Sequence, residues 1–305
     1  MKNSLIICNP NSGRVKNLNF KSKCLEILKC NGYQSNFVCS EYKGHAEKLV
    51  SEVKNVDLII SIGGDGTFSE IVSGNAKRNN PILISHIPAG TANDIGAMYG
   101  YSLNIVNDLE KILNGEIKNV DLGTINGIPF TYTVGFGKFL DVPYITSAEV
   151  KEKYGYLAYL IMALKKFKER IPNYRISYIN NGKIFDLECS FFLVTNSSKI
   201  AGTNGFYRNV LLDDGKFEVI MAKINNRFDM ISKLFSLVAK HGENNSNFNF
   251  LRTEEMKIFF HDDNIPTWCK DGEILDNIKN PVVISSKKKM KILLPRQNLG
   301  NLFLK

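Results

Sequence analysis

The sequence predicts an α/β protein of two domains, in which an α/β domain with a parallel sheet precedes a mostly antiparallel, sandwich-like β domain. Two observations support this fold class. Apolar strand patterns alternate with helical patterns over the first ~120 residues, and short strands between turn signals follow Asp121-Leu122-Gly123. We expect domains at 1–122 and 123–294, with residues 295–305 returning to the first. The 305 residues, 44% hydrophobic, are enough for two cores.

The first domain contains apolar runs that are typical of buried strands and amphipathic stretches that are typical of helices. Strands without alternation, separated by helices, indicate a parallel sheet covered on both faces. Ligands bind such sheets at the carboxyl ends of the strands. The expected strands are Ser4–Cys8, Gln34–Cys39, Asp57–Ile62 and Ile82–Ile87, and the expected helices are Phe20–Cys30, Gly44–Val53, Phe68–Ala76 and Ile105–Leu113.

The second domain is marked by hairpin and turn signals such as Asn126-Gly127, Asn180-Asn181-Gly182 and Asp213-Asp214-Gly215. The cleft between the two domains is the expected active site. The expected strands are Phe217–Ala222, Met256–His261, Pro266–Lys270, Val282–Ser285 and Met290–Leu294, interrupted by helices at Val150–Arg170 and Phe228–Lys240.

The composition limits the class of protein. A formal net charge of +9 favours anionic partners such as nucleotides or an anionic bilayer surface. Apolar runs are too short for a spanning helix or a secretory signal, and six cysteines without a C-x-x-C spacing indicate reduced thiols. We therefore expect a cytoplasmic protein. Nucleic acid is not an expected partner, because aromatic and basic residues are not interleaved.

The stretch Gly63-Gly64-Asp65-Gly66-Thr67 joins an expected strand to an expected helix. Its three glycines allow a sharp turn and the close approach of a ligand, and the N–H groups of a helix start favour negative charge. A carboxylate such as Asp65 repels phosphate unless a cation lies between them or the carboxylate handles a proton. The stretch therefore predicts metal-assisted phosphate chemistry, with an ordinary tight turn and a solvated Asp65 as the alternative.

Two further loops fall at the carboxyl ends of strands. Asn9-Pro10-Asn11-Ser12-Gly13 has the composition of a phosphate-wrapping loop, and Pro88–Asp94 combines a strand-ending proline with glycine, threonine, asparagine and aspartate. Asp94 is either functional or a helix cap. The chain lacks both G-x-x-x-x-G-K-[ST] and G-x-G-x-x-G, and its four histidines are scattered.

Together, Asn9–Gly13, Gly63–Thr67 with Glu70, and Pro88–Asp94 resemble the catalytic domain of the diacylglycerol kinase and sphingosine kinase superfamily, particularly its bacterial lipid kinases. Gly63–Thr67 alone also fits NAD kinases and phosphofructokinases. The stretch Pro88–Asp94 distinguishes this chain from both of those families. Further matches extend the resemblance over nearly the whole chain: Val120–Gly123, Asn196 through Gly205-Phe206, Asp213-Asp214-Gly215 and Asp271-Gly272-Glu273.

The resemblance implies an NAD-kinase-like α/β domain, a β-rich lipid-acceptor domain, and ATP with Mg²⁺ in the cleft. Asp65, Asp94 and Asp121 would organise the Mg²⁺, and Asp271 or Glu273 would be the base, with Asp65 also catalytic. A structural Mg²⁺ would bind the Asp214 carboxylate and the carbonyls of Leu211 and Lys216. The residues expected at ATP are Asn9, Pro10, Asn11, Ser12, Gly13, Ser40, Gly63, Gly64, Asp65, Gly66, Thr67, Glu70, Gly90, Thr91 and Asn93.

The leading hypothesis is an ATP-dependent lipid kinase that phosphorylates a hydroxyl of diacylglycerol or a related lipid, giving phosphatidic acid or an analogue. A kinase for a soluble acceptor such as NAD and a non-catalytic, nucleotide-binding membrane module are the alternatives. Two stretches depart from the pattern of the superfamily. Ile95-Gly96-Ala97 bears on the wall of the ATP pocket, whereas Lys138 and Leu140 bear on the lipid site, so the acceptor stays open.

The expected location is the inner face of the membrane, where the protein would bind peripherally to an anionic surface. The basic-ended stretch 151–170 is either a membrane-surface helix or a core helix. Arg14, Lys16 and Lys287–Lys289 are further candidates for contact with the membrane, and the resemblance also allows a homodimer.

Overall fold

The structure is a computed structural model that describes residues 1–15, 17–137, 171–200, 203–204, 207, 209–226, 228–230, 232–233, 236, 246–262, 264–297, 299 and 301–304. The expected helix at 150–170, Lys16, Lys138, Leu140 and the match at Gly205-Phe206 lie outside these residues. The chain divides into two compact units, unit 1 (Met1–Val120 with Lys289–Phe303) and unit 2 (Asp121–Lys288).

Unit 1 is built on a parallel sheet with the strand order β2-β1-β3-β4-β18. Registers run from Lys2↔Tyr33 to Cys8↔Cys39 between β1 and β2, and Ile292 of β18 pairs with Ile84 of β4. Both neighbours of β3 are parallel to it, which explains why its side chains are all buried. The strands are β1 (Lys2–Cys8), β2 (Tyr33–Cys39), β3 (Leu58–Gly63), β4 (Leu83–Pro88) and β18 (Val282–Leu294).

Strand β18 corrects the sequence analysis, which expected two separate strands in this region. The chain stays extended through Lys287, Lys288 and Lys289, and all three residues are exposed. Their charges break the apolar pattern but not the backbone pairing, because a strand needs no apolar side chain where it faces solvent. The strand begins in unit 2 and ends in unit 1.

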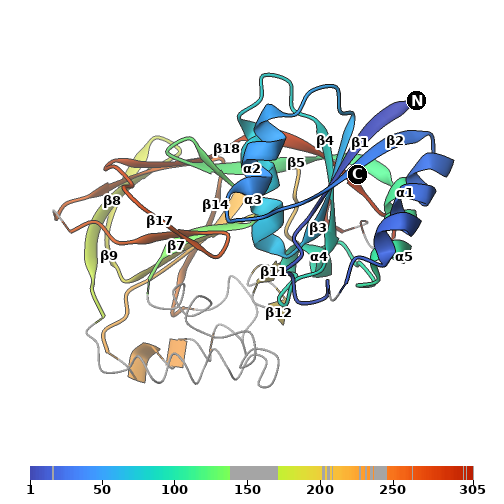
Figure 1. Ribbon diagram of the computed structural model, residues 1–305. Coiled ribbons are helices and arrows are strands. Elements are labelled where there is room, and N and C mark those ends of the chain that lie inside the picture. The colour runs from blue at the N-terminus through green and yellow to red at the C-terminus, as the bar shows by residue number, and fades with distance from the viewer. Residues whose placement is uncertain are drawn as a thin grey trace. The chain divides into compact units, whose positions relative to one another are not determined.

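The helices of unit 1 lie on both faces of its sheet. Helices α2 and α3 pack together on one face, and α1 and α5 pack together on the other (Figure 1). Gly74 of α3 permits the close packing of α3 against α2, since a Cβ there would lie 2.4 Å from the carbonyl oxygen of Glu47 in α2. The helices are α1 (Phe20–Cys30), α2 (His45–Glu52), α3 (Asp65–Ala76), α4 (Asp94–Met98) and α5 (Ile105–Leu113).

Among the described residues, unit 2 contains a separate antiparallel pair, β11 with β12, and two larger groups of antiparallel strands. One has the order β14-β13-β10-β7-β16-β17, and the other joins β9, β8, β15 and β18, with β5 beside β18 and β6 beside β5. The strands are β5 (Glu116–Ile125, entering from unit 1), β6 (Ile128–Phe130), β7 (Thr133–Phe136), β8 (Tyr174–Asn180), β9 (Lys183–Cys189), β10 (Phe191–Thr195), β11 (Lys199–Ile200), β12 (Thr203–Asn204), β13 (Phe217–Ala222), β14 (Asn249–Thr253), β15 (Glu255–Phe260), β16 (Trp268–Lys270) and β17 (Glu273–Leu275).

The core of unit 2 lies between these two groups of strands and is rich in aromatic residues. The ring of Phe136 is stacked on Phe192 at 5.5 Å and lies edge-on to Trp268 at 5.1 Å and to Tyr174 at 5.5 Å, measured between ring centroids. Residues from both groups of strands join one buried cluster. This packing confirms the predicted α/β class with a sandwich-like second part.

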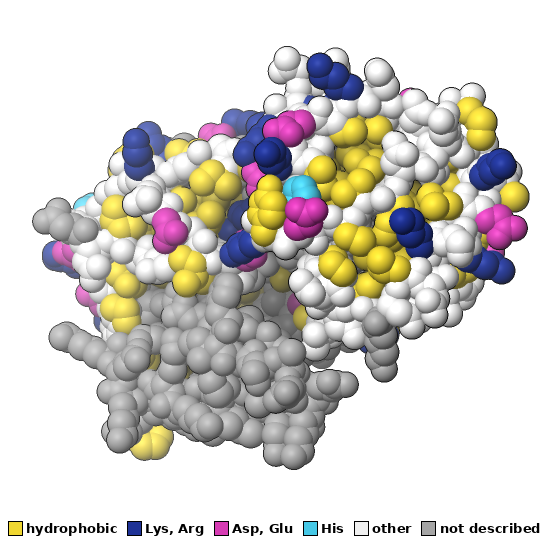
Figure 2. All heavy atoms as spheres, viewed as in Figure 1, with side chains coloured by type: hydrophobic (Ala, Val, Ile, Leu, Met, Phe, Trp, Pro, Cys, Tyr) yellow, Lys and Arg dark blue, Asp and Glu magenta, His cyan; other side chains and the backbone are white. Residues whose placement is uncertain are grey.

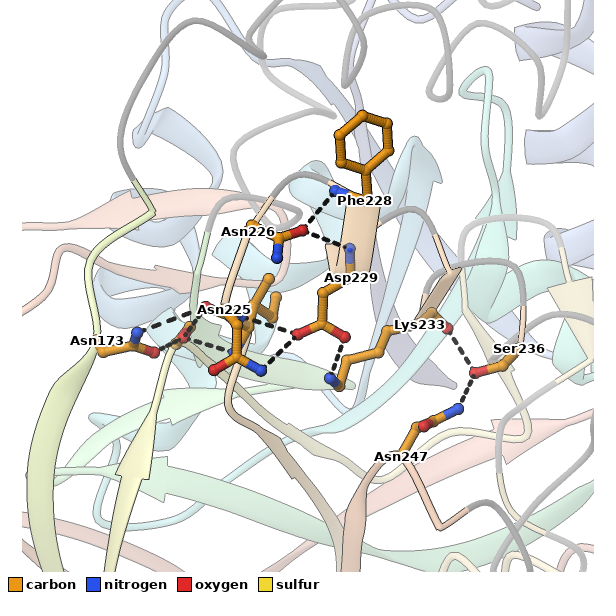
Figure 3. A network of polar contacts seen from close by, with 10 residues as sticks. Asn173, Asn225, Asn226, Phe228, Asp229, Lys233, Ser236 and Asn247 are labelled. Carbon is orange, nitrogen blue, oxygen red and sulfur yellow. Dashed lines mark hydrogen bonds and ion pairs between the residues drawn. The ribbon is translucent and has the colours of Figure 1, made fainter.

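A polar network fixes the start of the stretch that was predicted as a helix at 228–240, whose described residues are helical (Figure 3). Asn226 Oδ1 accepts the N–H groups of Phe228 (2.9 Å) and Asp229 (3.0 Å). The carboxylate of Asp229 accepts the N–H of Asn225 at 2.8 Å and pairs with Lys233. Burial raises the pKa of Asp229, but these partners outweigh burial and lower it. The network satisfies the helix start with side chains.

The surface mixes charges of both signs. Figure 2 shows Lys and Arg side chains interspersed with Asp and Glu, and with apolar side chains, over the face in view. The net charge of +9 is therefore not gathered into one basic patch on this face. Among the described residues, helices fall short of the length and apolar character that a bilayer crossing requires.

A buried histidine occupies β4 of unit 1. His86 is fully buried, its Nδ1 lies 3.2 Å from Ser61 Oγ, and its ring is stacked on Phe68. Its Nε2 makes no hydrogen bond with the described residues. Burial lowers the pKa of His86 to about 3, so the imidazole is neutral in the folded protein at neutral pH.

Acid should therefore destabilise the protein through His86. Because the histidine pKa is about 6.5 in the unfolded chain, the unfolded state binds a proton below that pH while the folded state does not. The free energy of unfolding should fall by about 1.4 kcal/mol for each pH unit below about 6.5. Urea unfolding between about pH 6.5 and about pH 5, above most carboxylate titrations, measures this slope. His86→Gln should flatten it, and an unchanged slope would contradict the assignment.

Candidate phosphate-binding site and associated carboxylates

The glycine-rich stretch connects β3 to α3 and lies against the end of β4. The N–H of Ala89 donates to the carbonyl of Gly63 at 2.6 Å. A Cβ on Gly90 would lie 2.6 Å from the Cα of Gly64 and 3.1 Å from Asn93 Oδ1. Two stretches of main chain therefore approach closely at Gly90, and only glycine fits there without a shift.

Helix α3 begins at Asp65, three residues before the predicted start, so Asp65, Gly66 and Thr67 form its first turn. Its first intrahelical hydrogen bond runs from the N–H of Phe68 to the carbonyl of Gly64. Its N-cap residue, Gly64, has no side chain that could cap this end. The preceding N–H groups lack an acceptor within the helix, and their partial positive charge favours an anion.

The carboxylate of Asp65 is directed at the start of α4. It accepts the N–H groups of Asp94 at 3.0 Å and Ile95 at 3.2 Å, and Asp65 is 8% exposed. Asn93 occupies the N-cap position, so Asp94 is the first residue of α4. The structure thus brings Asp65 and Asp94 together. It also shows that Asp65 caps the start of α4, a role that the sequence analysis did not predict.

The side chain of Asn93 closes the Pro88–Asp94 loop on itself. Asn93 has a left-handed backbone, with φ of 53°. Its Oδ1 accepts the N–H of Gly90 at 2.7 Å, and its Nδ2 donates to the carbonyl of Gly90 at 2.6 Å. Both polar groups of the amide therefore hold Gly90, while Thr91 next to it is exposed.

The loop after β1 joins the same place in unit 1. The N–H of Asn9 donates to the carbonyl of Ile62, and its Nδ2 donates to Thr67 Oγ1 at 3.2 Å. The N–H of Arg14 donates to the carbonyl of Ala89. Pro10, Asn11, Ser12 and Gly13 lie between these anchors, and Ser40 is held next to β1 by its N–H bond to the carbonyl of Cys8. The three predicted phosphate loops are therefore neighbours.

Glu70, which was expected at the nucleotide, has its carboxylate on the start of α2. It accepts the N–H groups of Gly44 at 2.8 Å and Ala46 at 3.2 Å. Helix α2 has no side-chain cap of its own, since its N-cap residue is Gly44. Glu70 thus supplies that cap from α3.

In unit 2, Asp121 lies on β5 and is 1% exposed. Its N–H donates to the carbonyl of Leu212 at 2.7 Å, and its Oδ2 accepts the N–H of Gly215 at 2.6 Å. Asp214 Oδ1 accepts the N–H of Lys216 at 3.0 Å. Asp121 therefore holds the turn that contains Leu211, Asp214 and Lys216. Within the described part of the chain, no cluster of three His, Cys, Asp or Glu side chains could hold a metal.

Asp271 and Gly272 form the two-residue turn between β16 and β17, with positive φ of 48° and 85°. The carboxylate of Asp271, which is 4% exposed, accepts three backbone N–H groups from the segment 131–133, at 2.7, 3.0 and 3.2 Å. Glu273 begins β17 and is half-buried. Asp271-Gly272 is therefore a hairpin turn that carries an anchored carboxylate.

The sequence analysis missed the segment 131–133, which contributes its main chain to this arrangement. Backbone N–H groups leave no trace in a sequence, so no residue type marked the segment. Asn196 was quoted only as part of a match, yet its N–H donates to the carbonyl of Tyr132 and its Nδ2 to the carbonyl of Asp121.

Three loops thus lie at the carboxyl ends of parallel strands beside the start of a helix, the place where α/β proteins commonly bind anionic ligands. The sequence model of the Diacylglycerol kinase catalytic domain matches residues 3–125. A diacylglycerol kinase from Staphylococcus aureus (strain bovine RF122 / ET3-1) is 30% identical over 230 residues, which are 74% of this chain and 72% of that protein. The chain belongs to the diacylglycerol kinase family.

Other relatives agree with this assignment. A diacylglycerol kinase from Bacillus subtilis (strain 168) is 28% identical over 264 residues, or 85% of each chain. A crystal structure of a diacylglycerol kinase from Bacillus anthracis str. Sterne superposes with a TM-score of 0.73 over 96% of this chain and 97% of that one, at 21% identity. The last comparison shows a shared fold.

Gly90→Ala should destabilise the protein, because the added Cβ meets the main chain of Gly64. The expected loss is about 1–3 kcal/mol in the free energy of unfolding. Gly66→Ala is the matched control for stability, since a Cβ there meets nothing within 4 Å and alanine favours a helix. Urea unfolding of the two variants measures the difference, and equal stabilities would refute the packing described at Gly90.

Proposed function

We propose that the protein is an ATP-dependent lipid kinase that transfers the γ-phosphoryl group of ATP to a hydroxyl of diacylglycerol or a related lipid. Membership in the diacylglycerol kinase family supports a kinase. The observation that carries the proposal is the uncapped start of α3, which presents N–H groups beside the exposed Asn11, Gly13 and Thr91. These groups suit the oxygens of a nucleotide phosphate chain.

The carboxylates present fit a Mg²⁺ ion that retains water. Asp65 and Asp94 adjoin each other in unit 1, and the described residues contain no cage of three acidic or imidazole ligands. Mg²⁺ is typically bound through one or two carboxylates together with waters and phosphate oxygens. When bound, it would neutralise charge on the phosphates. In this proposal Asp65, Asp94 and Asp121 hold the ion and its waters, and Asp214 with the carbonyls of Leu211 and Lys216 holds a structural ion.

For the base, we assign Glu273 in preference to Asp271. The Asp271 carboxylate already accepts three backbone N–H groups, so its oxygens are occupied in holding the segment 131–133. In the proposed reaction the lipid hydroxyl oxygen bonds to the γ-phosphorus, the bond from that phosphorus to the departing ADP oxygen breaks, and the hydroxyl proton passes to the Glu273 carboxylate.

A lipid acceptor requires access to a bilayer surface. The net charge of +9 favours an anionic leaflet, and the exposed Lys288 on β18 could contribute about 1 kcal/mol there. The proposed location is therefore the inner face of the membrane. The family names favour diacylglycerol over the soluble acceptor that a NAD-kinase-like enzyme would use.

Incubation with labelled ATP, Mg²⁺ and parallel acceptors should label diacylglycerol in anionic vesicles and leave NAD unlabelled. The rate should fall as salt rises, because salt screens attraction to the vesicle. Incubation with a total lipid extract, followed by identification of the phosphorylated species, then defines the acceptor. Labelled NAD with unlabelled lipids would refute the lipid assignment, and a rate independent of salt would refute electrostatic docking.

Glu273→Gln and Asp271→Asn should separate the base from the anchor. Glu273→Gln removes the proposed proton acceptor, so turnover should fall by about 10²–10⁴-fold with an unchanged melting temperature. Asp271→Asn exchanges one carboxylate oxygen for an NH₂ group that cannot accept the N–H groups of 131–133, so it should lower the melting temperature as well. Near-normal turnover in Glu273→Gln would overturn the assignment of the base.

A further inference from the structure

One asparagine connects the main chain of Asp121 to the segment 131–133, which Asp271 holds. Asn196 directly follows β10 and is 4% exposed. Its Nδ2 donates to the carbonyl of Asp121 at 3.0 Å, and its own N–H donates to the carbonyl of Tyr132 at 3.0 Å. A single residue thus bridges β5 and the segment 131–133.

The connection continues to the β16–β17 hairpin. The N–H of Tyr132 donates to Asp271 Oδ1 at 3.0 Å, so the peptide groups of Tyr132 lie between Asn196 and Asp271. The N–H of Asp271 in turn donates to the carbonyl of Thr133. Hydrogen bonds therefore run from Asp121 through Asn196 and Tyr132 to the turn that precedes Glu273.

The orientation of the Asn196 amide follows from its surroundings. If the amide were flipped, Oδ1 would face the carbonyl oxygen of Asp121, and two acceptors would repel each other. In the observed orientation Oδ1 is buried and accepts no hydrogen bond from the described residues. A buried acceptor without a donor costs about 1–3 kcal/mol, so the bond from Nδ2 to Asp121 holds the side chain against that cost.

We infer that Asn196 is a positioning residue that sets the spacing between Asp121 and the hairpin of Asp271 and Glu273. The inference rests on the proposed function, in which Asp121 organises Mg²⁺ and Glu273 accepts the proton. Partners that orient metal-binding and catalytic groups typically contribute about 10- to 100-fold to activity. Asn196 acts through these groups and does not itself contact the reacting atoms.

Asn196→Ala in the full-length protein tests the inference in two ways. The variant keeps the main-chain bond from residue 196 to Tyr132 but loses the Nδ2 bond that ties this main chain to Asp121. The segment 131–133 is then less constrained, so its amide hydrogen exchange should become faster, a readout that needs neither ATP nor Mg²⁺. Turnover of the folded protein should fall by about 10- to 100-fold, with a rise in the Mg²⁺ concentration for half-maximal rate. Asn196→Asp keeps the volume but places an oxygen against the Asp121 carbonyl, so it should lose as much turnover as Asn196→Ala.

Thr195→Val is the matched control. Thr195 is 1% exposed, and its hydroxyl makes no hydrogen bond with the described residues, so its loss should change neither exchange nor turnover. Unchanged exchange in Asn196→Ala overturns the inference whether or not the protein is active. Full turnover in Asn196→Asp also overturns it. So does a loss of turnover in either Asn196 variant that is no larger than the fraction of that variant found unfolded. An unaltered protein that phosphorylates no lipid would instead refute the proposed function, while the exchange measurement would still test the link.

Discussion

Helices α2 and α4 begin without side-chain caps of their own, and carboxylates of α3 satisfy their first N–H groups. Glu70 caps α2, and Asp65 caps α4. Buried N–H groups without acceptors are costly, so the two neighbouring helix starts are fixed relative to α3. The placement of α3 is fixed in turn by the contact of Gly64 with Gly90. The phosphate loops of unit 1 depend on this one helix.

Unit 2 uses an acidic side chain in the same way. Asp271 accepts three successive N–H groups from the segment 131–133. The main chain of this segment is linked in turn to Asp121 through Asn196. In both units, therefore, acids of the sequence motifs organise main chain directly. Substituting such an acid changes the geometry and the local charge together, so a loss of activity on its own does not identify a catalytic group.

The sequence predicted the fold of unit 1 closely, because apolar periodicity determines buried strands and helices. Helices Phe20–Cys30 and Ile105–Leu113 have the predicted bounds. The start of α3 was misplaced, since Gly66 in its first turn has low helix propensity and its N-cap residue, Gly64, has no side chain that could signal a cap. The single strand β18 was split in two because its exposed lysines carry no apolar signal.

The candidate site was predictable only in part. Residue types and spacing indicated the three loops. The donors that bond to the carboxylates of Asp65, Glu70 and Asp271 could not be predicted, because they are backbone N–H groups whose location depends on the tertiary fold. The same reason concealed Tyr132. A motif specifies which side chains are present, whereas the folded main chain decides what they hold.

The end of β18 has a consequence for how the protein is made. Unit 1 takes its fifth strand from the far end of the chain: Ile292 pairs with Ile84, and Ser85 Oγ donates to the carbonyl of Leu293 at 2.7 Å. On a ribosome, β4 emerges on the order of ten seconds before this partner. Until then β4 is an exposed, apolar edge that can pair with another chain. Unit 1 can therefore complete its sheet only after the whole of unit 2 has been synthesised.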